Sequence, residues 1–193
     1  MRKRFTTRII TYTALLTALQ VVLGSLVQVQ LGDWKQFNFG CLAIASAALL
    51  MGPVPAMVVA ALGDVVGTLL FPTGAYFPGF TLSNALVGLI YGLTLRRGGR
   101  NRLKAYVPNH DQELLVHAIL ASVLVATCYL LLNSYWLSIL YGSKTYAMWL
   151  SARAASNLVE IPVFSALIYL LSKALERLPV ELRPEAVEGR TRG

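Results

Sequence analysis

The sequence predicts an all-α polytopic membrane protein with six transmembrane helices. Of its 193 residues, 56% are hydrophobic and only 13% are charged, and its mean hydropathy is +0.60. A soluble domain carries about 25% charged residues, so most of this surface must face something other than water. Several apolar runs approach the ~20 residues that cross a bilayer as a helix. These runs should be helical because a backbone in hydrocarbon must satisfy its own hydrogen bonds.

The apolar runs place the six spans in order along the chain. They are expected at residues 9–27, 39–51, 54–71, 80–95, 114–132 and 146–171. No cleavable signal peptide is expected, because the basic start MRKR leads into a run too long for a typical signal. Residues 1–172 are predicted to form one six-helix transmembrane domain. Residues 173–193 are predicted to be a charged tail, in which KALERL is a candidate for a short separate helix.

The basic residues predict the orientation of the spans. With the N-terminus inside, fourteen Lys and Arg side chains fall on the inner side, in segments 2–8, 96–104 and 173–192, and only Lys35 and Lys144 fall outside. This bias is a strong positive-inside signal, and it places both termini in the cytoplasm. The net charge of +8 is thereby explained by the flanks of the spans, so no nucleic-acid partner is expected.

Motifs for catalysis, metals and nucleotides are missing from the sequence. YGSKTY (141–146) has Ser before Lys and lacks the earlier Gly of a phosphate-binding loop. No nucleophile elbow and no His-Glu-x-x-His motif is present. Cys41 and Cys128 lie inside apolar runs and are interpreted as small core residues. No catalytic residue, metal ligand or cofactor is therefore predicted.

Small residues repeat at a spacing of four in three spans. Ala14 and Ala18 share one face of the first helix, and the pairs Gly63/Gly67 and Gly88/Gly92 do the same in the third and fourth. Such faces let helices approach closely. Packing within the chain is favoured for both glycine pairs. For the alanine pair, packing within the chain and docking of another protein are both open.

Polar residues inside the spans are the informative exceptions, since charged groups in hydrocarbon are costly and usually face a cavity or a partner. For Asp64 and Glu160, each midway along a span, an ion pair or a hydrogen bond between helices is the favoured role. Arg153, Asn157 and Glu160 are spaced four and three apart, so they share a helical face. Arg153 and Asn157 are expected to meet a ligand, because they lie at a depth that the external turn FPTGAYFPGF (71–80) covers.

All three external connections are rich in aromatic residues. Single Trp and Tyr residues at a membrane interface are routine, but here each group has amide, hydroxyl or charged neighbours. The groups are residues 33–38, residues 76–80, and Tyr135, Trp136 and Tyr141. Flat rings with a few directional polar groups suit a flat heteroaromatic ligand. Arg153 and Lys35 would suit an anionic part of that ligand.

Three stretches resemble the substrate-binding S components of energy-coupling factor (ECF) vitamin transporters, specifically the folate group. FPTGAYFPGFTLSNALVGLIYGL (71–93) is similar to their third-loop and fourth-helix signature. TALLTALQVVL (13–23) is similar to their first helix, with its Ala-x-x-x-Ala face, and GPVPAMVVAALGDVVGTLLFPTG (52–74) to their second-to-third helix connection. The resemblance is strong over residues 10–95 and extends to the remainder by layout.

The resemblance implies an S-component fold and a function in extracellular capture of folate or a related pterin vitamin. It implies a multi-pass protein in the cell membrane of a prokaryote, with the vitamin held beneath the external connections. Ala14 and Ala18 match the motif that docks on the transmembrane coupling subunit, which carries two ATPase subunits. ATP would then drive the S component to topple in the bilayer and release its ligand inside.

The resemblance and the residue pattern together define a set of candidate ligand contacts. Arg153 and Asn157 are the expected directional partners, and Lys35 is the expected charge at the rim. The expected stacking surfaces and remaining contacts are Trp34, Tyr76, Phe77, Phe80, Ser83 and Asn84. Where the family's sixth helix usually has a further basic residue after its Arg, this chain has Asn157 and Glu160. Another B vitamin or precursor is therefore an alternative ligand.

Two other classes of protein are the rivals of this hypothesis. An intramembrane lipid-modifying enzyme would use Asp64 and Glu160 as an acidic pair, but these are single acids on separate helices. An autonomous secondary carrier would transport its solute without other subunits. The S-component hypothesis predicts a binding protein that is not an enzyme and that transports nothing without its energising subunits.

Overall fold

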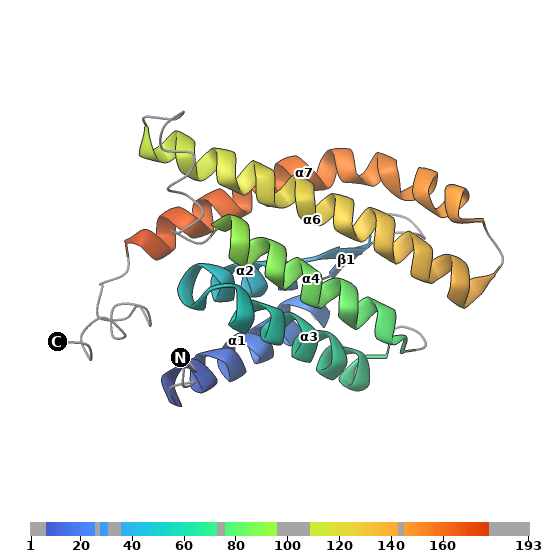
Figure 1. Cartoon of the computed structure of the whole chain (residues 1–193), viewed down its shortest axis with the longest axis horizontal. Coiled ribbons are helices and arrows are strands. Elements are labelled where there is room, and N and C mark those ends of the chain that lie inside the picture. Colours follow the sequence, from blue (N-terminus) through green and yellow to red (C-terminus); the bar gives the residue numbers. More distant parts are fainter. Residues whose placement is uncertain are drawn as a thin grey trace.

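Six helices and one small hairpin make up the part of the chain that the structure, a computed structural model, describes (Figure 1). The described residues are 7–25, 28–30, 36–72, 76–95, 109–142 and 145–177. The helices are α1 (Thr7–Ser25), α2 (Gly40–Met51), α3 (Pro53–Leu70), α4 (Pro78–Leu95), α6 (His110–Tyr141) and α7 (Tyr146–Glu176). The prediction of a helical fold is thus confirmed, with boundaries for α1 to α4 close to those expected.

The last two helices are longer than the apolar runs indicate. α6 extends beyond both ends of the expected span. It ends before Gly142, whose backbone adopts the left-handed conformation (φ 57°) that terminates many helices. Tyr135, Trp136 and Tyr141 therefore lie on α6, where the sequence analysis expected a connection after the span. α7 continues to Glu176, so residues 173–176 of KALERL belong to this helix. Hydropathy marks where a helix leaves the hydrocarbon, whereas the helix ends where the backbone changes conformation.

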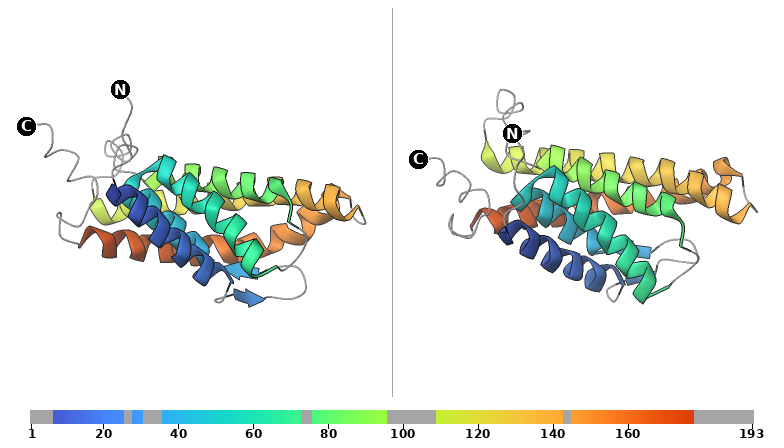
Figure 2. Two further views of the ribbon diagram at one scale, coloured as in Figure 1. Left: turned by 90° about the horizontal axis from the view of Figure 1, so that it is seen from below. Right: turned by 60° about the horizontal axis from the view of Figure 1, so that its bottom comes forward.

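A two-stranded hairpin joins α1 to α2, and the sequence analysis did not predict it. β1 (Gln28–Gln30) pairs antiparallel with β2 (Gln36–Asn38), with Val29 opposite Phe37. The hairpin lies beside the end of α1 (Figure 2). Asn38 closes it onto α2, because its Oδ1 accepts a hydrogen bond of 2.7 Å from the backbone N–H of Gly40.

Glycines bring α3 and α4 into backbone contact. A Cβ added at Gly88 would lie 2.5 Å from the carbonyl oxygen of Ala56, and one at Gly92 would lie 2.2 Å from Cα of Pro53. Gly63 is covered in the same way by the side chain of Gln20 from α1. The preference for packing of these glycines within the chain is therefore confirmed. The close approach holds α3 and α4 side by side along their length.

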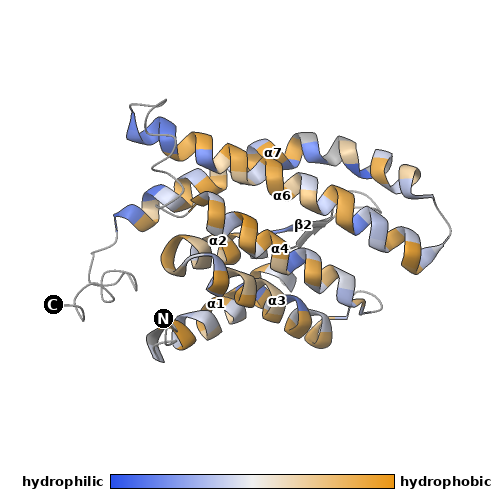
Figure 3. Ribbon diagram, in the orientation of Figure 1, coloured by the Kyte–Doolittle hydropathy of each residue, from blue (hydrophilic) through white to orange (hydrophobic). Residues whose placement is uncertain are grey.

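The core lies where α2, α3, α4 and α6 meet, and α1 and α7 add Leu16 and Ile168 to it. It consists mainly of small apolar side chains, and its largest fully buried members are Tyr91, Ile44 and Ile168. α3, α4 and α6 are each long and apolar enough to cross a membrane, whereas the described α1 and α2 are shorter apolar helices. Large apolar side chains are exposed on nearly every helix, and apolar residues dominate the middle of the bundle (Figure 3). Such a surface suits a lipid surrounding.

The small residues of α1 face outward. Ala14 and Ala18 are both exposed, together with their neighbours Leu15 and Leu19, while Leu16, Thr17, Gln20 and Val21 face the bundle. Packing within the described chain therefore does not explain the alanine pair. This exposed apolar face remains available to another molecule.

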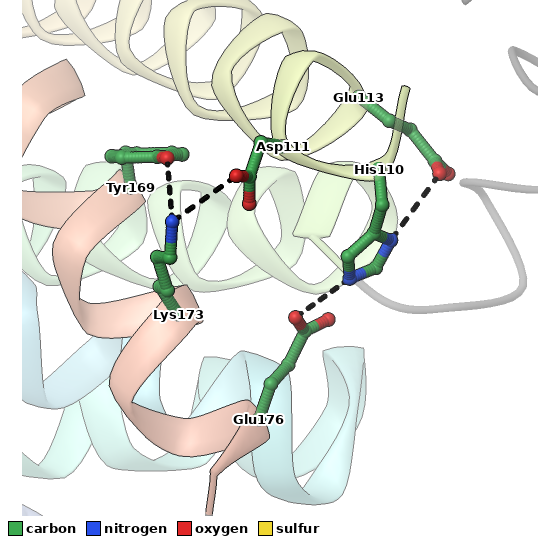
Figure 4. Close-up of polar contacts among 6 residues, drawn as sticks. All are labelled: His110, Asp111, Glu113, Tyr169, Lys173 and Glu176. Atoms are coloured by element: carbon green, nitrogen blue, oxygen red, sulfur yellow. Dashed lines mark hydrogen bonds and ion pairs between the residues drawn. The ribbon is translucent and has the colours of Figure 1, made fainter. Parts of the chain in front are cut away.

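The start of α6 and the end of α7 are linked by polar contacts (Figure 4). His110 Nε2 lies 2.8 Å from a carboxylate oxygen of Glu176, and Lys173 donates a hydrogen bond of 3.2 Å to Asp111. His110 also lies 3.9 Å from Glu113. These hydrophilic helix ends (Figure 3) lie at the end of the bundle away from the hairpin.

Candidate ligand-binding site

A cavity of about 280 Å³ lies among the helices. Its size is near the lower end of the range of small-molecule sites, ~300–1,000 Å³. α2, α3, α4, α6 and α7 all contribute to its wall, and Gln20 reaches it from α1. The apolar part of the wall includes Ile44, Phe80, Val125, Ala126, Leu130, Ile161 and Phe164. The polar part includes Gln20, Asn38, Asp64, Asn84, Ser122, Tyr129, Asn133, Arg153, Asn157 and Glu160.

A hydrogen-bonded network organises the wall formed by α3, α4 and α6. Asp64 accepts hydrogen bonds from Thr81 Oγ1 at 2.6 Å and from Asn84 Nδ2 at 2.7 Å. Asn84 Oδ1 in turn accepts a hydrogen bond from the Tyr129 hydroxyl. Because both ends of the Asn84 amide are engaged, its orientation is fixed. The network therefore presents a rigid polar surface to the cavity.

Three polar atoms on the wall have no hydrogen-bond partner within the described part of the chain. They are Gln20 Oε1, Asn133 Oδ1 and Ser122 Oγ, all buried. Gln20 is held in place by its other end, since Nε2 donates a hydrogen bond of 3.4 Å to the carbonyl oxygen of Ala60. A buried polar atom without a partner is costly. These atoms expose almost no surface of their own, so they belong to the support of the wall and not to the surface that a ligand touches.

α7 contributes charges of both signs to the cavity. Arg153, Asn157 and Glu160 all line it, as their spacing along one helical face predicts. Asn157 Nδ2 donates to the carbonyl oxygen of Ala126 at 3.5 Å, which connects this face to α6. The guanidinium of Arg153 is half-buried and can hold an anionic group through its planar fork.

Four of the candidate contacts from the sequence line this cavity, namely Phe80, Asn84, Arg153 and Asn157. Trp34 and Lys35 lie outside the described residues. Tyr76 is exposed, and its hydroxyl lies 3.1 Å from the hydroxyl of Thr81, which donates a hydrogen bond to Asp64.

Phe77 and Ser83 form the support behind the cavity instead of its wall. The Phe77 ring packs against Phe80 and Trp136, with centroids 6.0 and 5.6 Å apart. Ser83 is fully buried and accepts a hydrogen bond of 3.0 Å from Trp136 Nε1. These contacts hold the start of α4 against α6. They thereby position Phe80 and Asn84, which do face the cavity.

Several of the wall residues that the sequence analysis missed follow a regular spacing. On α6, Ser122, Val125 or Ala126, Tyr129 and Asn133 recur every three to four residues. Tyr91 lies two turns from Asn84 on the same face of α4. A search for polar residues along one face of each span, as was done for Arg153 and Asn157, would have marked Ser122 and Tyr129 as candidates, although the face that turns inward depends on the neighbouring helices. Asn38 gave no such signal because it lies in the unpredicted hairpin.

The fold and the cavity define a helical membrane protein that holds a small molecule within its bundle. The family model of the ECF transporter substrate-specific component matches residues 8–172. The chain therefore belongs to this family of transporter components. It is not an enzyme, and the alternative of a lipid-modifying enzyme is wrong.

Similar proteins cover nearly the whole chain. The folate transporter FolT of Clostridium novyi is 29% identical over 171 residues, which are 88% of this chain and 90% of that protein. FolT of Leuconostoc mesenteroides is 26% identical over 169 residues, 86% of this chain and 84% of its own.

Two solved structures share the fold. The crystal structure of FolT bound with folic acid has a TM-score of 0.71 at 27% identity and covers 90% of this chain and 97% of that one. The S-component for biotin from an ECF-type ABC transporter has a TM-score of 0.61 at 18% identity, covering 93% and 96%. At this low identity the second match shows the fold alone. The expected S-component fold is thus confirmed.

Proposed function

We propose that this protein captures folate, or a closely related pterin vitamin, as the substrate-specific component of an ECF importer. The observation that carries the proposal is the cavity among the helices, with ring and amide groups on its wall, in a fold shared with FolT bound with folic acid. The two FolT relatives, which match along most of their length, support the same ligand.

The cavity wall has the groups that folate needs. Folate joins a pterin to an aminobenzoate and a glutamate, so it requires ring surfaces, polar partners for the pterin edge and a cation for its carboxylates. Phe80 offers a ring face, Asn84 and Asn157 offer amides, and Arg153 offers the cation. The predicted contact set also includes residues of the outer connections and residues that support the wall. These are Trp34, Lys35, Tyr76, Phe77 and Ser83.

The partners and location in this proposal follow the family. The exposed face of Ala14 and Ala18 is the proposed docking surface for the transmembrane coupling subunit, which carries two ATPase subunits. The chain would cross the cell membrane of a prokaryote six times, with both termini in the cytoplasm, as the distribution of Lys and Arg supports. Toppling of the whole component in the bilayer, driven by ATP, would release the ligand inside.

The decisive experiment is isothermal titration of the detergent-purified protein with folic acid and a panel of other B vitamins. Saturable binding of folic acid in preference to the others is expected. A preference for a different vitamin would show that the chain is an S component of another specificity. The acidic side chain of Glu160 in the cavity is the observation that favours this alternative. Absence of binding to any of them would refute the proposal.

Uptake measurements separate this function from that of an autonomous carrier. Vesicles that contain this chain alone should accumulate no labelled folate, whereas vesicles that also contain the coupling and ATPase subunits should do so with ATP. Uptake by the chain alone would refute the assignment to an energised complex.

A further inference from the structure

Asp64 is an acidic residue in the third helix of a membrane protein. It lies on α3, well inside both ends of the helix, and lines the cavity. A carboxylate at such a position is expensive, and it persists where a partner or a function compensates it. The groups around Asp64 therefore show what the carboxylate is for.

Neutral donors compensate Asp64. Its two oxygens each accept one hydrogen bond, from Thr81 and from Asn84. No Lys, Arg or His forms an ion pair with it among residues whose contacts the structure describes. A carboxylate has about four acceptor sites, so each oxygen retains capacity for a second donor.

A purely structural role would not need a charge at this place. A hydroxyl or an amide could also join α3 to α4 through Thr81 and Asn84, at a lower desolvation cost. Asp64 combines this spare acceptor capacity with a place on the cavity wall. Its carboxylate thus indicates that the occupant of this cavity presents N–H donors to the wall.

We infer that Asp64 is a specificity-determining residue that reads the donor edge of the ligand's heterocycle. This inference rests on the proposed function, because the pterin of folate places a ring N–H beside an exocyclic amino group. These two adjacent donors form a fork like that of a guanidinium, and a carboxylate accepts such a fork with both oxygens. The anionic glutamate of folate is repelled by Asp64, so the uncharged ring system is the part that meets it.

Thr81 is a positioning residue for this recognition. It donates to Asp64 but does not line the cavity. Its hydroxyl also contacts that of Tyr76, which connects the carboxylate to the segment that precedes α4. A change at Thr81 therefore tests the orientation of Asp64 without removing the carboxylate.

The test is isothermal titration of purified wild-type protein and of Asp64→Asn with two ligands, folic acid and 2-deaminofolic acid, which lacks the exocyclic amino group. Wild type should bind folic acid about 10- to 100-fold more tightly than the analogue, as expected for a hydrogen bond to a charged group. Asp64→Asn should lose most of its affinity for folic acid and lose less affinity for the analogue, which keeps only the ring N–H of the two donors. The preference between the two ligands should thus largely disappear.

Two control variants at Thr81 separate positioning from folding. Thr81→Val should weaken folic acid binding, and Thr81→Ser, which keeps the hydroxyl, should restore it. If Asp64 only joined the helices, Asp64→Asn would weaken both ligands by the same factor, and that result would overturn the inference. If Asp64→Asn does not fold, the wild-type protein alone tests the inference. Equal affinity of the wild type for folic acid and for the analogue would overturn it. Folic acid binding without this discrimination refutes the inference alone, whereas no binding of folic acid to the wild type refutes the proposed function as well.

Discussion

Gly88 on α4 lies directly against the backbone of α3, which makes it a sharp test of the packing behind the cavity. In Gly88→Ala, the new Cβ would lie 2.5 Å from the carbonyl oxygen, and 2.7 Å from the carbonyl carbon, of Ala56. A flexible side chain could turn away, but these are backbone atoms. Because carbon contacts are optimal at ~3.5–4.0 Å, α3 and α4 would have to separate by roughly 1 Å.

The expected effect follows from two opposing terms. Overpacking of this kind costs about 1–3 kcal/mol, whereas replacement of a helical Gly by Ala stabilises by up to about 1 kcal/mol. Gly67→Ala on α3 is the matched control, because its Cβ would meet only Ser25 Oγ at an ordinary 3.7 Å. Gly88→Ala should therefore melt several degrees below Gly67→Ala. Its folate affinity should also fall, since the hydrogen bonds of Asp64 cross the same helix pair.

Thermal unfolding of the purified variants in detergent measures the first effect, and titration with folic acid measures the second. Gly88→Ala should be lower in both quantities, whereas Gly67→Ala should melt at or slightly above wild type and bind folic acid with unchanged affinity. Equal melting temperatures and equal affinities for the two variants would show that α3 and α4 are not in backbone contact.

The remaining predictions concern the ligand, the partner and the far end of the bundle. Arg153→Ala should weaken folic acid binding at least tenfold, about 1.4 kcal/mol, with Arg153→Lys intermediate in titration; unchanged affinity in folded protein would remove Arg153 from the site. Ala14→Trp should prevent co-purification with the coupling subunit while leaving folic acid binding intact. Leu93→Trp, at an exposed position of α4, is the control and should still co-purify. If the Ala14→Trp complex still assembles, the α1 face is not the docking surface. His110→Ala should lower the unfolding free energy by less than about 1 kcal/mol, because the His110 side chain is 59% exposed and its buried partner Glu113 is 3.9 Å away, and a larger loss in thermal unfolding would contradict this estimate.

The helices could be located from sequence because their signal is local. Hydrophobic runs placed α1 to α4 within a few residues of their observed ends. The ends of α6 and α7 were missed because the chain remains helical after it stops being apolar, until Gly142 and Arg177. The hairpin was missed because strands of three residues are too short to produce a periodic pattern.

The candidate site was only partly readable for a different reason. Arg153 and Asn157 were found because charged and amide groups are conspicuous in an apolar span, and both line the cavity. Tyr129 and Asn133 follow an equally regular spacing on α6, but which face of that helix turns inward depends on its neighbours. Phe77 and Ser83 have the composition of ligand contacts, yet they pack against Trp136.

Composition and local pattern are thus sufficient to identify a helical membrane protein of the ECF S-component type, since burial in lipid acts on each span separately. The arrangement of the site depends on contacts between distant parts of the chain. Asn84 joins Asp64 to Tyr129 only because the glycines of α4 allow α3 and α4 to touch and α6 closes the third side. Such contacts depend on the depth and rotation of every helix at once, so no single stretch of sequence contains them.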